Sequence, residues 1–510
     1  MPIYGNYQGA VRSISPIYGN KDGVTKALDA IYGNRDGVVT PIYQLSHVDI
    51  PYWTFDINKS NKSVSLKTYI GYTQAGIKDV VIDGANNPKY TIYMDENYVA
   101  SDRFVNSSYK YINSFVAKNI SIPSMYRMFY DCQNLVSVDM SNEVVENTRN
   151  MSYAYAHCYN FVEEPVCYPN VTNMSGAYSE CYNITGQPEC GPNVIDFSSA
   201  YDYCRRLTGS PVCGDKVENM ASAYRQCYNL TGSPVCGPNV TNMYQAYRQC
   251  NHITGNPACG NKVINMSNAY YWCHNITGSP VCGPNVTNMS NAYCDCRNLT
   301  GKPICGPNVT NMSWAYAHCS GLTGSPVCGN NVKSMSSAYY NCTHITGSPV
   351  CGPNVTNMRN TYYRCYNLTG NPVCGNKVTD MMSAYDGCFR LTGSPVCGPN
   401  VQSIAAAYRG CSSITGSPVC GDKVMYMQYA YNGCGNLTGN PVCGPNVTNI
   451  AYAYYGCRKL TGSVYIHSNN ITNAVNAFFD CSINTIYVHP NTTSWNSFVN
   501  AGYANEMVAF

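Results

Sequence analysis

Apolar and polar positions along most of the chain follow one pattern that returns every 23 residues. In one copy, Met243, Ala246, Tyr247 and Cys250 stand at positions i, i+3, i+4 and i+7, which is the spacing of one face of a helix. A glycine and an extended stretch ending near Cys259 follow. The pattern therefore predicts a short helix and a short strand in each copy.

An Ala-Tyr-x-x-Cys motif carries this regularity, with Thr361 once in place of the alanine. A repeat of about 20 to 29 residues is typical of solenoids, because one copy buries too little apolar surface to fold alone. We expect an α/β solenoid of short parallel strands and short helices over residues 121–482. A small β-rich region is expected before it.

The first residues carry a different repeat. Ile3, Ile17 and Ile31 each begin an Ile-Tyr-Gly-Asn sequence, 14 residues apart. Such glycine and asparagine pairs form turns between β-prone residues, so short strands are expected. Residues 1–45 are too few to bury a core, which favours an attachment module that docks onto another protein or forms a homo-oligomer. A flexible tail is the alternative.

Each end of a solenoid needs a cover, because its terminal copy has no neighbour. Residues 46–120 are predicted to be a β-rich linker and N-terminal cap, and residues 483–510 a C-terminal cap. The expected strands of the first are Ser63–Ile70, Asp79–Asp83 and Tyr90–Met94. The second is expected to hold a strand at Ile486–Pro490 and a helix at Ser494–Ala504.

Charge and hydropathy exclude several kinds of partner. Only 12% of the residues are charged and the net charge is +3, so nucleic acid is not an expected partner. The sequence holds no apolar run of 18 residues, so membrane insertion is not expected either. The first residues show no basic stretch followed by an apolar core, and we expect no secretory signal peptide.

The 30 cysteines follow from the repeat, which holds two of them. One column is the cysteine of Ala-Tyr-x-x-Cys, and we expect it to be a buried thiol. The other follows Pro-Val, as at Cys236. Cys294 and Cys296 are the one close pair, so neither a metal site nor a cofactor is expected. Disulfides between the columns remain open, although parallel side chains in one column are poorly placed to bridge.

The chain resembles the BspA-type leucine-rich repeat over roughly residues 60–505. Phe129-Tyr-Asp-Cys132-Gln-Asn-Leu135 and Ala477-Phe-Phe-Asp-Cys481 fit the Ala-Phe-x-x-Cys unit of that family. Tyrosine for phenylalanine in most copies, and Ser-Pro-Val in the strand, depart from it. The resemblance implies a leucine-rich-repeat array that binds without chemistry. The first 45 residues are similar to short N-terminal modules of phage tail-associated proteins.

An enzyme would need a nonrepeating cluster of acid, base or nucleophile, and the sequence shows none, so we do not expect an enzyme. The positions flanking each Ala-Tyr-x-x-Cys cysteine vary instead, with aromatic residues and arginines that are common in binding hot spots. The candidate ligand-binding residues are Arg225, Arg248, Tyr271, Trp272, His274, Arg297, His318, Tyr340, Tyr363, Arg364, Phe389, Arg390 and Arg458. Neutral variation on a solvated face is the other interpretation.

The resulting hypothesis is a noncatalytic host-recognition protein of a phage tail, located in the virion. It would bind a host cell-surface protein or glycan through its repeats, and other virion tail proteins through residues 1–45. The alternative is a BspA-like adhesin on a bacterial cell surface.

Overall fold

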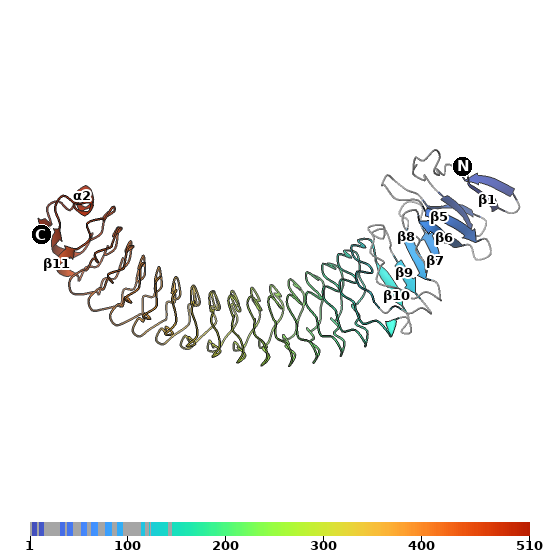
Figure 1. Cartoon of the computed structure of the whole chain (residues 1–510), viewed down its shortest axis with the longest axis horizontal. Coiled ribbons are helices and arrows are strands. Elements are labelled where there is room, and N and C mark those ends of the chain that lie inside the picture. The colour runs from blue at the N-terminus through green and yellow to red at the C-terminus, as the bar shows by residue number, and fades with distance from the viewer. Residues whose placement is uncertain are drawn as a thin grey trace. The chain divides into compact units, whose positions relative to one another are not determined.

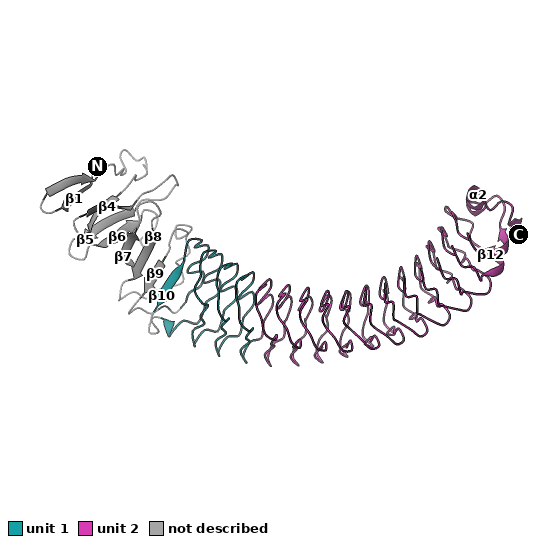
Figure 2. Cartoon of the chain, turned by 180° about the vertical axis from the view of Figure 1, so that it is seen from behind, with its two compact units in different colours: residues 1–217 teal, residues 218–510 magenta. Residues whose placement is uncertain are grey.

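The computed structural model describes residue 122, residues 124–140 and residues 145–510 in full, together with the backbone of strands β1 to β9 before them. It divides into two compact units, residues 1–217 and residues 218–510 (Figure 2). The division falls within the range that was predicted as a single array.

Antiparallel hairpins and a mixed sheet make up the first part of unit 1. The hairpins are β1 (Ile3–Tyr7) with β2 (Ala10–Ile14), β3 (Ile31–Arg35) with β4 (Val38–Tyr43), and β5 (Trp53–Asn58) with β6 (Ser63–Tyr69). The mixed sheet has the order β10 (Ser137–Met140), β9 (Ser114–Ala117), β8 (Lys89–Met94) and β7 (Ile77–Asp83). The strands expected in residues 46–120 are present, whereas the second Ile-Tyr-Gly-Asn copy lies outside the described residues.

The C-terminal end of unit 2 is a parallel sheet with one helix. Strands β11 (Thr461–Ile466), β12 (Ser482–Val488) and β13 (Met507–Ala509) are neighbours in that order. Helix α2 (Thr493–Asn500) begins after Thr492, whose hydroxyl accepts a bond from the Trp495 amide at 3.1 Å. It buries Phe498. The strand and helix expected near the end of the chain are therefore present (Figure 2).

Between these ends the copies of the repeat stack side by side in each unit, as the closely spaced loops of Figure 1 show. In unit 2, the ring of Tyr247 stacks on that of Tyr270 with centroids 5.5 Å apart, and Tyr270 on Tyr293 at 5.4 Å. Met243 and Cys250 are fully buried with the tyrosines. The prediction that these side chains share one buried face is confirmed.

The predicted short helix in each copy is wrong. Residues 243–250 form consecutive turns, in which Gln245 and Gln249 have positive φ angles of 56° and 64°. Every second amide from Met243 to Gln249 donates to a carbonyl of the next copy, those of Met243 and Tyr247 both at 2.8 Å. A helix would need these amides for its own carbonyls. Turns at the same spacing bury the same side chains and also join the copies.

An asparagine stands directly before most of the series of turns in the described copies. The Asn242 side-chain oxygen accepts from the Tyr244 amide at 3.1 Å, and Asn265 bonds the Ser267 amide at 3.0 Å in the same way. Such bonds to an amide two residues ahead form an Asx turn rather than a helix cap. The backbone of Asn242 also bridges to Asn265 of the next copy.

The predicted parallel strand is also wrong for the described copies between β10 and β11, where the Pro-Val-Cys segment forms no strand. Proline supplies no amide hydrogen. The Val235 amide donates to the Tyr247 hydroxyl at 3.1 Å, and that hydroxyl donates to the Val235 carbonyl at 2.7 Å. One tyrosine thus occupies both backbone groups that a sheet neighbour would use. We call this pair of bonds the tyrosine clamp.

The two cysteine columns differ in burial. Cys250 and its equivalents are buried, except that Cys481 is half-buried, and the Cys250 thiol donates to the Tyr224 carbonyl at 2.8 Å. Most cysteines of the Pro-Val-Cys column are half-buried, and burial raises the pKa of Cys236 to about 11. The cysteines of both columns have free thiols.

Candidate functional site: the Tyr-Cys edge

The candidate residues lie along one edge of unit 2. We call this the Tyr-Cys edge and define it as the two positions before and the two after each Ala-Tyr-x-x-Cys cysteine in residues 218–482. The tyrosine and the cysteine of each copy point into the core. Most of the side chains next to the cysteine are therefore at least partly exposed. The residue directly before the cysteine has positive φ in these copies, as at Trp272 (64°) and His318 (61°).

Four of the predicted residues form a first cluster. The Arg248 guanidinium lies over the Tyr271 ring, 5.1 Å from its centroid. The rings of Tyr271 and Trp272 stack at 5.8 Å, and Trp272 lies 5.9 Å from the His274 ring. Desolvation raises the pKa of Tyr271. The structure therefore joins residues of two successive copies into one aromatic group.

A second cluster begins two copies further along. The His318 and Tyr340 rings are 5.2 Å apart, and Tyr340 stacks on Tyr363 at 4.6 Å. The Arg364 guanidinium lies over Tyr363 at 5.2 Å. Trp314, which sequence reasoning missed, joins this group at 5.6 Å from Tyr340. In the sequence, Trp314 could have been identified by its position two residues before the buried tyrosine of its copy. The backbone there has a positive φ of 60°, which turns the side chain outward.

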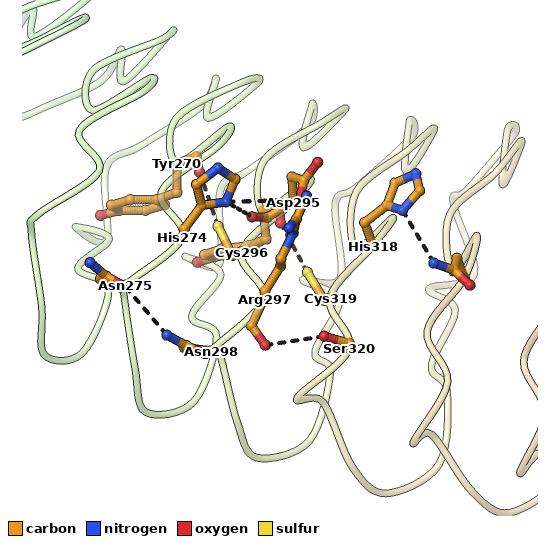
Figure 3. A network of polar contacts seen from close by, with 12 residues as sticks. Tyr270, His274, Asn275, Asp295, Cys296, Arg297, Asn298, His318, Cys319 and Ser320 are labelled. Carbon is orange, nitrogen blue, oxygen red and sulfur yellow. Dashed lines mark hydrogen bonds and ion pairs between the residues drawn. The ribbon is translucent and has the colours of Figure 1, made fainter. Parts of the chain in front are cut away.

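An ion pair occupies the copy between the two clusters. The Arg297 Nε donates to the Asp295 Oδ1 at 2.6 Å, and the His274 Nδ1 lies 3.0 Å from the Asp295 backbone oxygen. Figure 3 shows these three side chains next to one another on neighbouring copies. Asp295 is a second residue that sequence reasoning missed, although it stands directly before Cys296. An acidic residue is not among the residue types that mark binding hot spots in a sequence.

The remaining predicted residues lie apart from these clusters. Arg225 bonds the Gln245 side chain at 3.2 Å, and Arg458 pairs with Asp480 at 2.8 Å. Phe389 stacks on Tyr366 at 5.3 Å, and Arg390 is exposed. The structure thus brings together the residues between Arg248 and Arg364 and leaves the others as separate positions on the same edge.

The side chains of the Tyr-Cys edge are of kinds that commonly bind ligands. Its polar groups include arginines, imidazoles and the carboxylates of Asp295, Asp386 and Asp480 beside exposed aromatic rings, a mixture suited to binding ligands with both polar and apolar surfaces. In the described part of the chain, no three His, Cys, Asp or Glu side chains gather as metal ligands. The thiols beside the edge are buried, and burial raises the pKa of Cys294 to about 12. A thiol of that pKa is a poor nucleophile at neutral pH.

Parts of the chain are similar to known proteins. Residues 98–189 match the family described as "Mycoplasma protein of unknown function, DUF285". The chain is similar to the crystal structure of a leucine-rich repeat protein from Bacteroides ovatus, with 11% sequence identity and a TM-score of 0.35. That comparison covers 86% of this chain and 99% of the other. No curated protein matches the chain.

Helices long and apolar enough to cross a membrane are absent from the described residues.

Proposed function

We propose that the chain is a noncatalytic adhesion protein that binds a cell-surface protein or glycan through the Tyr-Cys edge. The observation that carries this proposal is the pair of aromatic clusters between Arg248 and Arg364, whose rings are in mutual contact and partly exposed. Rings held by their neighbours lose little conformational freedom on binding, so their exposed surface is available at low entropic cost. In this proposal, the repeats form a leucine-rich-repeat solenoid of the BspA type.

We further propose that the protein is associated with a phage tail and recognises the host. In this proposal residues 1–45 attach to other virion tail proteins and the repeats reach the host surface. The resemblance of the Ile-Tyr-Gly-Asn repeats to phage modules supports it. A BspA-like adhesin on a bacterial surface is the second candidate, supported by the resemblance of the repeats themselves.

Replacing Tyr271 and Trp272 together by alanine tests the binding edge. We expect binding of the full chain to its natural target cells to fall by about tenfold or more, as for a central aromatic hot spot. Thermal unfolding should change little, because both residues lie outside the core. The matched control is Tyr426→Ala, which removes an exposed ring that lies off the edge. Equal binding by the double variant and the control would contradict the proposal.

Mass spectrometry of purified phage particles tests the location. Stoichiometric amounts of this chain in the particles would support the tail assignment. Its absence there, together with its presence on the envelopes of uninfected bacteria, would support the adhesin alternative.

A further inference from the structure

The copy made of residues 289–311 differs from its neighbours at the Tyr-Cys edge. Its side chains there include Cys294 and Asp295, both buried, where the copy before it carries Tyr271 and Trp272. The copy after it carries Trp314. Cys294 and Asp295 therefore stand between Trp272, which belongs to the edge, and Trp314, which contacts the edge at Tyr340.

The two tryptophans present apolar surface on either side of this copy. Trp272 is 40% exposed and Trp314 is 38% exposed. Their copies are separated by two steps of the core stack, with tyrosine ring spacings of 5.4 and 5.6 Å. Successive sugar units of a glycan chain advance by a comparable distance, so a chain lying along the edge would meet one such position after another.

Between the tryptophans the structure offers directed polar groups. The Asp295 side chain is only 11% exposed, and its Oδ1 is occupied by Arg297. Its Oδ2 has no hydrogen-bond partner among the described residues. The Arg297 side chain is 62% exposed, which leaves its guanidinium open to a ligand. A fixed carboxylate oxygen can accept a bond, and an exposed guanidinium can donate several.

His274 adds a further acceptor. A bond from its Nδ1 to the Asp295 backbone oxygen, 3.0 Å away, requires the hydrogen on Nδ1. In the neutral imidazole, Nε2 is then an acceptor. The site thus combines two acceptors, a donor and two exposed rings. Sugars carry both the hydroxyl groups and the apolar C–H faces that such a set recognises.

We infer that Asp295, Arg297 and His274, with Trp272 and Trp314 on either side, bind successive neutral sugar units of a surface glycan. This inference rests on the proposed adhesive function and names the ligand class of its edge. The positive charge of Arg297 is already balanced by Asp295, so the site does not favour an anionic polymer.

The test uses the full chain and an immobilised panel of neutral oligosaccharides: cello-, chito-, malto- and galacto-oligosaccharides. We expect binding to at least one of them, with little dependence on salt. Asp295→Asn should weaken it by about tenfold or more, because the amide loses an acceptor and the charge-assisted bond to Arg297. Asp386→Asn is the matched control, since Asp386 is also buried and paired, with Arg409 at 2.6 Å, but lies outside the proposed site.

Cell binding separates this inference from the proposed function. Periodate treatment of target cells, which cleaves sugar diols, should abolish binding of the full chain, whereas protease treatment should not. Loss of binding after protease alone, or binding only to charged glycans in a salt-dependent way, would overturn the sugar assignment and leave adhesion intact. Failure of the chain to bind untreated target cells would instead contradict the proposed function.

Discussion

The tyrosine repeats and the segments near each end of the chain provide partners for the same backbone groups in different ways. In the repeats from Tyr247 to Tyr454, the segment before the buried tyrosine is closed by the tyrosine clamp, as at Val235 and Tyr247. At the C-terminal end Phe478 replaces the tyrosine, and the segment before it is β11, paired with β12. At the N-terminal end Phe129 likewise follows β9, paired with β10.

A third position supports the same rule. Tyr155 has a hydroxyl, but it hydrogen-bonds the Tyr168 side chain, and the segment before Tyr155 contains β10. Strands thus occur where the hydroxyl is missing or engaged elsewhere. Buried backbone groups need a partner, and either a sheet neighbour or a tyrosine hydroxyl supplies it. One oxygen atom in the side chain decides between the two.

The largest expected difference between the clamped repeats and the end segments is in their stability at high pH. Desolvation, followed by the nearby tyrosines, raises the pKa of the clamping residues Tyr270 and Tyr293 well above 10. In the unfolded chain these tyrosines ionise near pH 10. The stability they contribute is therefore complete below pH 10 and is lost as the pH rises above it, at about 1.4 kcal/mol per pH unit for each buried tyrosine.

We expect cooperative unfolding of the middle of the stack between about pH 10 and 12, because many such tyrosines contribute together. Tyrosinate absorbance and circular dichroism, recorded together, measure it. Ionisation of all tyrosines near pH 10 with the fold retained would contradict the buried clamp.

A single clamp can be removed by Tyr431→Phe. The Tyr431 hydroxyl accepts from the Val419 amide at 3.1 Å and donates to its carbonyl at 2.6 Å. Losing it leaves both backbone groups without this partner, at a cost of about 1–3 kcal/mol in the free energy of unfolding. Denaturant titration measures the change. Tyr426→Phe, at an exposed ring, should change it by less than about 0.5 kcal/mol. Equal changes in the free energy of unfolding for the two variants would show that the clamp hydroxyl does not stabilise the repeats.

The sequence predicted the core of this stack well and its backbone poorly. The spacing of Met243, Ala246, Tyr247 and Cys250 identified the buried face, because burial depends on which side chains point the same way. Helices and turns can satisfy that spacing equally. The choice between them depends on bonds to the next copy, such as that from the Tyr247 amide to the Ala269 carbonyl, which no single copy reveals.

Only part of the candidate site could be predicted, again because some of its contacts join neighbouring copies. Variation around the cysteines located the edge and most members of its aromatic clusters. It could not show that Trp314 leans onto Tyr340 or that Asp295 holds Arg297, since these pairs depend on positive φ angles and on adjacent copies. The departure from the family pattern, tyrosine for phenylalanine with Ser-Pro-Val before it, was visible in the sequence. Its meaning as a clamp required the structure.

The smallest expected effect comes from the reverse exchange, Phe478→Tyr. Phe478 is 5% exposed and stacks on Tyr454 at 5.6 Å. A hydroxyl added there faces a segment in which Tyr465 is already paired with Tyr487 in the sheet, so it enters the core without a free backbone partner. We expect a loss of about 1–2 kcal/mol, measured by denaturant titration. A gain in stability would show that the end segment can exchange its strand pairing for a clamp. The presence of phenylalanine or tyrosine would then be the whole difference between the two regions.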